Sequence, residues 1–165
     1  MTTGLSTYNC TIQLKKKGGA NNSYESDITN FSETAIDKRI SYSQVISGLI
    51  VPKIEETIYK EVTFDFVIGG VDLERFIDDT YTNKVVDWDN TDQYRIVITF
   101  TNGIETYIKA YYNAYVKILD TYVENEVLKG KITFTLPIKD ISGKINFAVY
   151  ESLTDLSAKD IEMGY

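Results

Sequence analysis

The chain contains no histidine among its 165 residues and a single cysteine, Cys10. Without histidine, catalytic or metal sites of the Ser-His-Asp, Cys-His and HExxH kinds are excluded. A lone cysteine likewise excludes an internal disulfide and a paired-cysteine metal site. Carboxylates, tyrosines and lysines remain, but no nucleophile–base pair can be named among them. We therefore expect no enzyme activity, no metal site and no cofactor.

Long apolar runs and basic leader segments are missing as well. No stretch approaches the roughly 20 continuous apolar residues of a membrane helix. Residues 1–5 lack the basic start and the apolar run of a signal peptide. Proline occurs only 2 times and glycine 10 times, which excludes a collagen-like or linker-dominated chain. Apolar residues still make up 43% of the chain, so we expect one domain, 1–165, with a buried core and no membrane segment.

Basic residues are fewer than acidic ones, 17 against 24, which gives a formal net charge of -7. Proteins that grip nucleic acid by neutralising phosphates carry the opposite balance, so this chain should repel DNA on average. Tyrosine is unusually frequent, with 13 residues. Because tyrosine favours strands and surfaces that are apolar on one side and wet on the other, we expect a β-rich protein that meets other proteins.

Alternation of apolar and polar residues predicts most of the secondary structure. Strands with one buried face are expected over the ranges 5–16, 61–68, 94–100, 104–110, 114–122, 127–136 and 145–149. Residues 20–41 are polar and irregular and are expected to be mostly loop. The helical spacing of Leu73, Phe76 and Ile77 predicts a short helix at about 71–83. The tail, residues 151–165, is expected to be frayed or weakly helical.

An Asn-Gly pair between two alternating segments predicts a β-hairpin. A two-residue turn would mix polar and apolar side chains on each face of this hairpin. A three-residue loop with Gly103 in the left-handed conformation sets Phe100 against Ile104 and Ile96 against Ile108, which gives one apolar face. The hydrophobic pattern therefore favours the three-residue loop.

An apolar run with a glycine and a proline inside it follows the polar segment. Because Pro52 cannot donate a hydrogen bond to a central ladder, this run belongs at a sheet edge or in an extended arm. Two interpretations stay open: an ordinary edge strand packed on its own core, or an apolar arm at about 43–58 that docks on a neighbouring subunit. The candidate self-assembly residues are Val45, Ile46, Leu49, Ile50, Val51 and Ile54.

Two charged segments are similar to binding motifs without matching them. The acidic segment 87–92 has Asp92 where an EF-hand needs glycine and Ile98 where it needs the bidentate glutamate. The basic segment 15–17 precedes a glycine pair that lacks the spacing of a phosphate-binding loop. We interpret both segments as solvated loops or strand ends.

The order of elements from residue 60 onward is strand, glycine break, short helix, acidic loop, strand, Asn-Gly hairpin and further strands. In this order the chain resembles the major tail tube proteins of long-tailed bacteriophages, which have the lambda-like tail tube fold. The resemblance is carried by residues 62–66, 73–76, 92–100, 101–103 and 129–135.

This resemblance implies a mainly β fold: a β-sandwich or split β-barrel with one short flanking helix and an extended arm or hairpin loop. It also implies that six copies close into a ring and that rings stack into a hollow conduit for DNA during ejection. The arm would reach the adjacent ring. Partners would be the chain itself, tape measure and terminator proteins, while double-stranded DNA passes through without specific binding. The location would be the virion tail, assembled in the host cytoplasm.

Two alternatives to a tail tube subunit stay open. Other phage tail components, such as terminator, distal ring or hub proteins, use a similar fold. A β-sandwich could instead present a tyrosine-rich face to a glycan or a protein, with Tyr107, Tyr111, Tyr112 and Tyr115 as the candidate residues.

Overall fold

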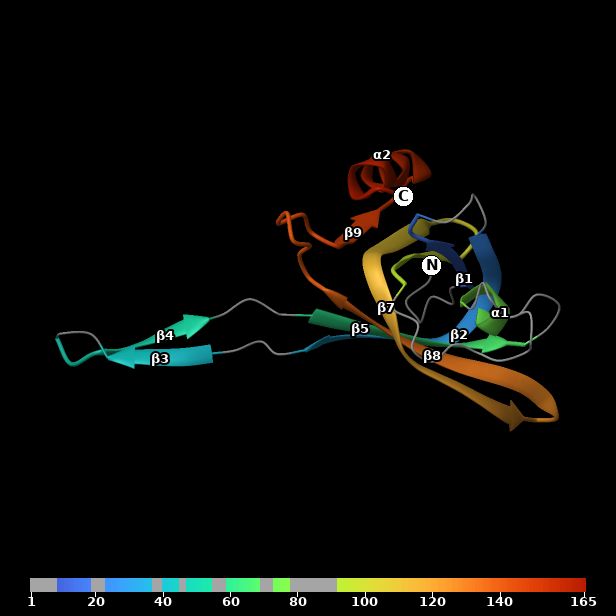
Figure 1. The fold of residues 1–165 in the computed structure, drawn as a ribbon, viewed down its shortest axis with the longest axis horizontal. Coiled ribbons are helices and arrows are strands. Elements are labelled where there is room, and N and C mark those ends of the chain that lie inside the picture. The colour runs from blue at the N-terminus through green and yellow to red at the C-terminus, as the bar shows by residue number, and fades with distance from the viewer. Residues whose placement is uncertain are drawn as a thin grey trace.

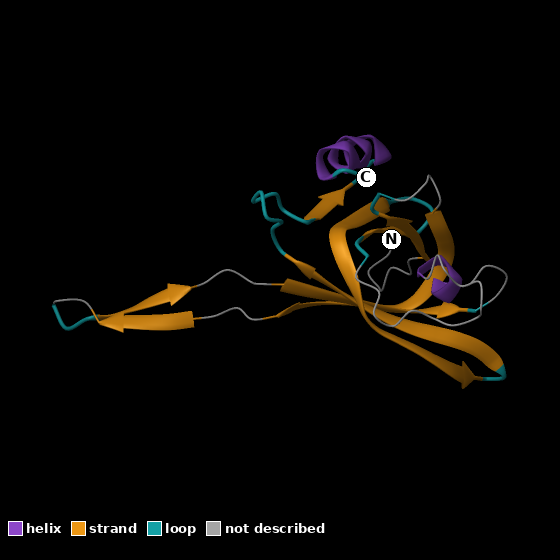
Figure 2. Ribbon diagram, in the orientation of Figure 1, coloured by secondary structure: helices purple, strands orange, loops and turns teal. Residues whose placement is uncertain are grey.

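The computed structural model describes residues 9–18, 23–36, 40–44, 47–54, 59–68, 73–77 and 92–165. Most of these residues form antiparallel strands (Figure 2), which confirms the mainly β fold class. The strands are β1 (Asn9–Lys16), β2 (Ser23–Ile36), β3 (Ile40–Gln44), β4 (Ile50–Ile54), β5 (Tyr59–Val67), β6 (Tyr94–Thr101), β7 (Thr106–Glu124), β8 (Val127–Pro137) and β9 (Phe147–Tyr150). The helices in this part of the chain are α1 (Leu73–Ile77) and α2 (Leu153–Met163).

Six of the strands close into a barrel. Neighbouring strands follow the order β6-β1-β2-β5-β8-β7, and β7 pairs back to β6, so each barrel strand has a partner on both sides. β9 lies outside this ring and pairs with residues 108–111 of β7. Figure 1 shows β7 curving around the barrel, with α2 near β9. Of the two predicted arrangements, sandwich and barrel, the structure therefore has the barrel.

β7 closes the barrel because it bends. Its first half pairs with β6 and its second half with β8, and the halves meet at Asn113, whose backbone is left-handed (φ 57). The buried Asn113 amide donates to Oδ1 of Asn146 (2.9 Å), and Oδ1 of Asn113 accepts from Nζ of Lys17 (2.9 Å). These bonds satisfy polar groups that would be costly to bury without partners.

Apolar side chains from all six strands of the ring fill the barrel interior. The alternation predicted for 61–68 is confirmed, since Val62, Phe64 and Phe66 are all buried. Phe66 pairs with Gly130 of β8, and its ring occupies the space that a Cβ on this glycine would need. The interior is therefore packed without room for an additional side chain at this position.

One end of the barrel is covered by α1. The apolar side of this helix is buried in the barrel core, and the Tyr94 hydroxyl donates to the carbonyl oxygen of Ile77 (3.0 Å). The helix lies inside the predicted range of about 71–83. Residues 78–91, which include most of the predicted acidic loop, lie outside the described residues.

α2 packs on the outer face of β6 and β7. The buried members of the apolar cluster between helix and sheet are Val97, Ile108, Ala110, Tyr112, Leu156 and Met163. Asp160 adds polar contacts, because it pairs with Arg95 and accepts a hydrogen bond from the Tyr112 hydroxyl (2.6 Å). Gly164 ends the helix in a left-handed conformation (φ 84). Of the two expectations for the tail, frayed or weakly helical, the structure has a helix, and buried side chains and an ion pair hold this helix on the sheet.

The register of the β6–β7 hairpin differs from the predicted one. Phe100 pairs with Tyr107 and not with Ile104, so residues 102–105 form the loop, one residue longer than predicted. Gly103 is left-handed (φ 87), as predicted.

The predicted register assumed that only one face of this hairpin is buried. Because α2 covers the outer face, Ile108 belongs to the outer cluster, and Tyr111 takes the place opposite Ile96 in the barrel core. When both faces are buried, apolar alternation does not select the register. The loop is stabilised instead by Asn102, whose Oδ1 accepts a hydrogen bond from the backbone N–H of Glu105 (2.7 Å).

β2 is the strand that apolar alternation does not reveal. The expectation that residues 20–41 are mostly loop is wrong, because Ser23–Ile36 pairs with β1 on one side and β5 on the other. Its inward positions are even-numbered up to Ile28 and odd-numbered from Phe31 onward. A bulge around Asn30, which is left-handed (φ 53), causes this change and interrupts the alternation.

Candidate assembly surface

β3 and β4 form a hairpin, here called the hairpin arm, that projects from the barrel (Figure 1). It is a separate two-stranded sheet, and among the described strands β3 and β4 pair only with each other. Pro52 lies in β4 opposite Tyr42, and a two-stranded sheet has an outer edge on each strand where proline is tolerated. The structure therefore contains an extended arm, not an edge strand packed on the barrel.

The hairpin arm exposes apolar side chains at its tip, Leu49 and Ile50, and in the middle of β3, Tyr42. The exposed fractions are 66% for Leu49, 69% for Ile50 and 70% for Tyr42. Of the remaining candidate residues, Val51 and Ile54 belong to β4. Val45 and Ile46 lie outside the described residues. An isolated two-stranded hairpin is marginally stable in water, and exposed apolar side chains mark interaction sites. The arm thus has the properties of a segment that a partner covers.

A cluster around Glu33 of β2 joins three strands of the barrel. Lys60 Nζ donates to Oε1 of Glu33 (2.6 Å), while Lys109 Nζ (2.8 Å) and the Tyr111 hydroxyl (2.6 Å) donate to Oε2. The Lys60 ammonium also lies 3.6 Å from the centre of the Phe147 ring. The Glu33 carboxylate therefore links β2 to β5 and β7, and Lys60 extends the cluster to β9.

Burial and charge together set the protonation of this cluster. Burial alone would raise the pKa of Glu33, but the hydrogen bonds from Lys109, Lys60 and Tyr111 lower that pKa to about 2. Burial, followed by the hydrogen bond to Glu33, raises the pKa of Tyr111 above its ordinary value. At neutral pH Glu33 is therefore a carboxylate and Tyr111 a neutral phenol.

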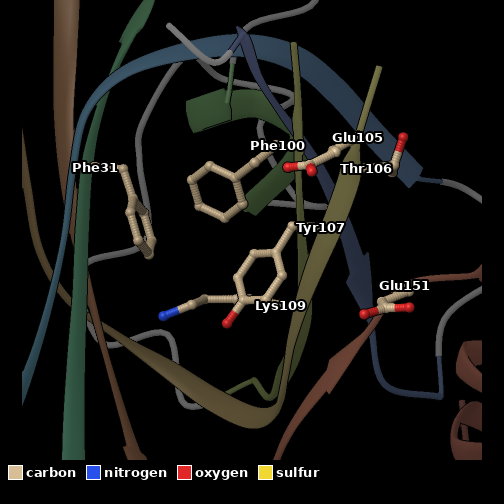
Figure 3. A pocket seen from close by; sticks show the side chains of 7 residues that line it. All are labelled: Phe31, Phe100, Glu105, Thr106, Tyr107, Lys109 and Glu151. Atoms are coloured by element: carbon tan, nitrogen blue, oxygen red, sulfur yellow. The ribbon is translucent and has the colours of Figure 1, made fainter. Parts of the chain in front are cut away.

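A pocket of about 800 Å³ opens beside the end of β6 and the start of β7 (Figure 3). We call it the mouth pocket; its lining residues are Phe31, Phe100, Glu105, Thr106, Tyr107, Lys109 and Glu151. Figure 3 shows the rings of Phe31, Phe100 and Tyr107 on one side of β7, with Thr106 and Glu151 on its other side. The aromatic rings thus form one part of the pocket lining.

Aromatic contacts hold the walls of the mouth pocket. The ring centres of Phe31 and Phe100 are 5.3 Å apart in an edge-on arrangement, and those of Phe100 and Tyr107 are 6.0 Å apart. Lys109 joins the pocket to the Glu33 cluster, because its ammonium donates to Glu33.

The predicted tyrosine platform does not exist as one surface. Tyr111 and Tyr112 are both fully buried, Tyr111 in the barrel core and Tyr112 beneath α2. Tyr107 lines the mouth pocket, and the Tyr115 hydroxyl accepts a hydrogen bond from Nε2 of Gln93 (2.7 Å). Tyr111 and Tyr112 are successive residues of β7 and point to opposite faces, and neither is exposed, so the four tyrosines do not form one platform. The alternative of a glycan- or protein-binding module built on them is therefore wrong.

The basic and thiol side chains that could serve binding or catalysis make structural contacts instead. Lys16 of the basic segment forms an ion pair with Asp92 (2.8 Å), and Cys10 is partly buried against the barrel core, where burial raises the pKa of its thiol. Within the described ranges, no group of three or more His, Cys, Asp or Glu residues is placed to hold a metal ion. No helix in that part of the chain is long and apolar enough to cross a membrane.

No protein-family model and no curated protein sequence matches this chain. Among solved structures, a chain of the anti-feeding prophage baseplate is 11% identical with a TM-score of 0.59, and the match covers 91% of this chain and 97% of that one. A chain from the sheath/tube terminator of the extracellular contractile injection system PVC is 13% identical with a TM-score of 0.54, covering 84% and 92%. A chain from the PVC sheath-tube complex is 12% identical with a TM-score of 0.51, covering 86% and 88%.

These matches define the class of fold. The chain has a phage-tail-like fold that it shares with chains of contractile injection systems. At such low identity the likeness shows the fold alone. The narrower resemblance to the major tail tube proteins of long-tailed phages stays an interpretation of the sequence.

Proposed function

We propose that this chain is a structural protein of a phage-tail-like particle and assembles with copies of itself. The observation that carries the proposal is the hairpin arm, a separate two-stranded sheet with exposed Leu49 and Ile50 that projects from a closed barrel. Because the barrel buries its own core, the arm is the part that gains most from a partner. The fold shared with chains of a baseplate, a sheath/tube terminator and a sheath-tube complex supports this role.

Within such a particle, we favour the role of a tail tube subunit. Six copies would close into a ring, and stacked rings would form a hollow conduit for DNA during ejection. The net charge of -7 supports this role, because a wall of like charge does not hold DNA. Tape measure and terminator proteins would be further partners, the virion tail would be assembled in the host cytoplasm, and no enzymatic step belongs to this function.

A terminator, distal ring or hub role is the second candidate, because the matching structures include a baseplate and a sheath/tube terminator. Copy number separates the two candidates. A tube subunit is present in many copies along the tail, whereas a terminator or hub protein forms a single ring at one end. Quantitative mass spectrometry of purified particles measures this ratio directly.

Electron microscopy of the concentrated protein tests self-assembly. The wild-type chain should form hollow rings or tubes, and Leu49→Asp should abolish them by placing a charge on the tip of the hairpin arm. Ile141→Asp is the matched control, because Ile141 is fully exposed in the β8–β9 connection. Assemblies that persist in Leu49→Asp would contradict the role of the arm. A chain that forms no rings and is absent from purified tail particles would contradict the proposed function.

A further inference from the structure

The mouth pocket lies beside the start of β1. Residues 1–8 lie outside the described residues, and Asn9, the first residue of β1, joins them to the barrel at this place. We propose that residues 5–8 cover the mouth pocket of their own chain with the side chains of Leu5 and Tyr8. The inference goes beyond the proposed function, because it concerns a contact within one chain.

The pairing of the strands fixes where this segment joins the barrel. Asn9 of β1 lies opposite Thr101 of β6, and Thr101 lies opposite Thr106 of β7, which lines the pocket. Neighbouring strands are about 4.8 Å apart, so two such spacings, about 10 Å, separate Asn9 from β7. An extended chain covers this distance in about three residues. Residues 5–8 are therefore long enough to cross the pocket.

The alternation of β1 directs Tyr8 toward the aromatic rings of the pocket. Every second side chain of β1 is packed in or against the barrel core: Cys10, Ile12 and Leu14. Because side chains of a strand alternate between its faces, continuing β1 toward the N-terminus puts Tyr8 on this inner side. Phe100 lies opposite Cys10, and Tyr107 lies opposite Phe100. The Tyr8 ring would thus lie next to a row of inward side chains that already contains two aromatic rings.

The composition of the segment suits this surface. Residues 2–8 read TTGLSTY and carry no charged side chain. The Lys109 ammonium of the pocket already donates to Glu33, so a neutral segment brings no charge that would need a partner of its own there. A pocket of about 800 Å³ lies in the range of sites that enclose drug-sized molecules, so it has room for a leucine and a tyrosine side chain. Docking would remove aromatic surface of the pocket from water.

The covalent connection favours this segment over a segment of a second copy. Because residue 8 is bonded to Asn9, the effective concentration of the segment at the pocket is on the order of millimolar, above the concentration of other copies in dilute solution. The mouth pocket would then belong to the fold of the single chain. Partners in a particle would bind other surfaces.

Disulfide trapping within one chain tests this contact. Both variants carry Cys10→Ser, which removes the natural thiol, and Ser6→Cys, which leaves the two proposed docking side chains in place. The test variant adds Tyr107→Cys in the pocket, and the control adds Thr99→Cys on the outer face of β6, two residues from Val97 of the outer cluster. A disulfide requires the two Cα atoms to approach within about 7 Å.

Oxidised in dilute solution, the test variant should form about 10-fold more intramolecular disulfide than the control. Thr99 lies on the strand next to β1, whereas Tyr107 lies one strand further away, so a segment that does not dock would favour the control. Non-reducing electrophoresis with mass spectrometry separates a cross-link within one chain from a cross-link between two chains. Thermal unfolding of the reduced variants checks that they are folded, and Glu105→Cys replaces Tyr107→Cys if that variant is not.

A yield in the control equal to or above that of the test variant would overturn the inference. A cross-link found mainly between two chains would overturn it as well, because the occupant would then come from a second copy. Rings or tubes formed by a chain without the intramolecular cross-link would refute this contact and leave the proposed function standing. A specific cross-link within a chain that forms neither rings nor tubes would support the contact and count against the proposed function.

Discussion

The ring of Phe66 lies against Gly130 on the neighbouring strand, and a Cβ on this glycine would come within 3.0 Å of three ring atoms. Gly130→Ala should therefore lower the free energy of unfolding by about 1–3 kcal/mol, since the buried ring cannot shift without disturbing the core. Denaturant unfolding measures the loss. In a Phe66→Leu background the same substitution should cost less, because the ring is absent. An equal cost in both backgrounds would contradict this relationship.

Glu33→Gln should lower the free energy of unfolding by about 2 kcal/mol at pH 7. The substitution leaves the Lys60 and Lys109 ammonium groups near each other without the carboxylate that both contact. Glu61→Gln is the matched control, because Glu61 pairs with Lys117, whose side chain is half-exposed, and such pairs contribute less than about 1 kcal/mol. Losses of the same size in chemical denaturation would show that Glu33 contributes no more than an exposed ion pair.

The lowered pKa of Glu33 predicts a pH dependence of stability. The pKa falls from the ordinary 4.5 to about 2 on folding, so the unfolded state takes up the proton first as the pH falls. The stabilisation is therefore fully present above the ordinary value and is lost as the pH falls toward about 2. Wild type and Glu33→Gln should differ most at neutral pH and converge in acid. Unfolding curves at several pH values measure the difference, and a constant gap down to the lowest pH would argue against Glu33 as its source.

Leu156→Ala should lower the free energy of unfolding by about 2–4 kcal/mol, because it leaves a cavity between α2 and the sheet. Ile161→Ala removes an exposed side chain from the same helix and should change stability by no more than about 0.5 kcal/mol. Thermal or chemical unfolding distinguishes the two variants. If both variants lost equally little stability, the packing of α2 on β6 and β7 would not be what holds the helix on the sheet.

Asn113 combines a left-handed backbone with a buried side chain at the bend of β7. Asn113→Gly keeps the backbone conformation accessible but removes the hydrogen bonds to Asn146 and Lys17. Asn113→Ala removes those bonds and adds backbone strain, so it should be less stable than Asn113→Gly by about 1 kcal/mol. Equilibrium unfolding of the two variants measures this difference. An alanine variant as stable as the glycine variant would show that the left-handed backbone at position 113 does not disfavour alanine.

Much of the barrel could be predicted from local patterns. Val62, Phe64 and Phe66 alternate in the sequence and are buried in the structure, and the left-handed Gly103 follows from an Asn-Gly pair between two strands. An apolar run containing glycine and proline drew attention to Leu49 and Ile50, which the structure places exposed on the hairpin arm. These features depend on residues close together in the chain.

Other features could not be predicted in this way. The bulge at Asn30 moves the inward positions of β2 from even to odd, so the strand shows no regular alternation. The covering of Ile108 by α2 buries the second face of the β6–β7 hairpin, which removes the basis for choosing its register. The mouth pocket was not predicted, because Phe31, Phe100 and Tyr107 come from three different strands.

The sequence by itself determined the β-rich class, the absence of histidine-based chemistry, the acidic charge and an apolar segment interrupted by Pro52. Only the tertiary structure decided that the strands close into a barrel, that α2 covers its outer face and that aromatic rings from three strands line a pocket beside Glu33. The physical reason is that alternation records the burial of one face of one strand. Closure, covering and concavity depend instead on contacts between residues far apart in the chain.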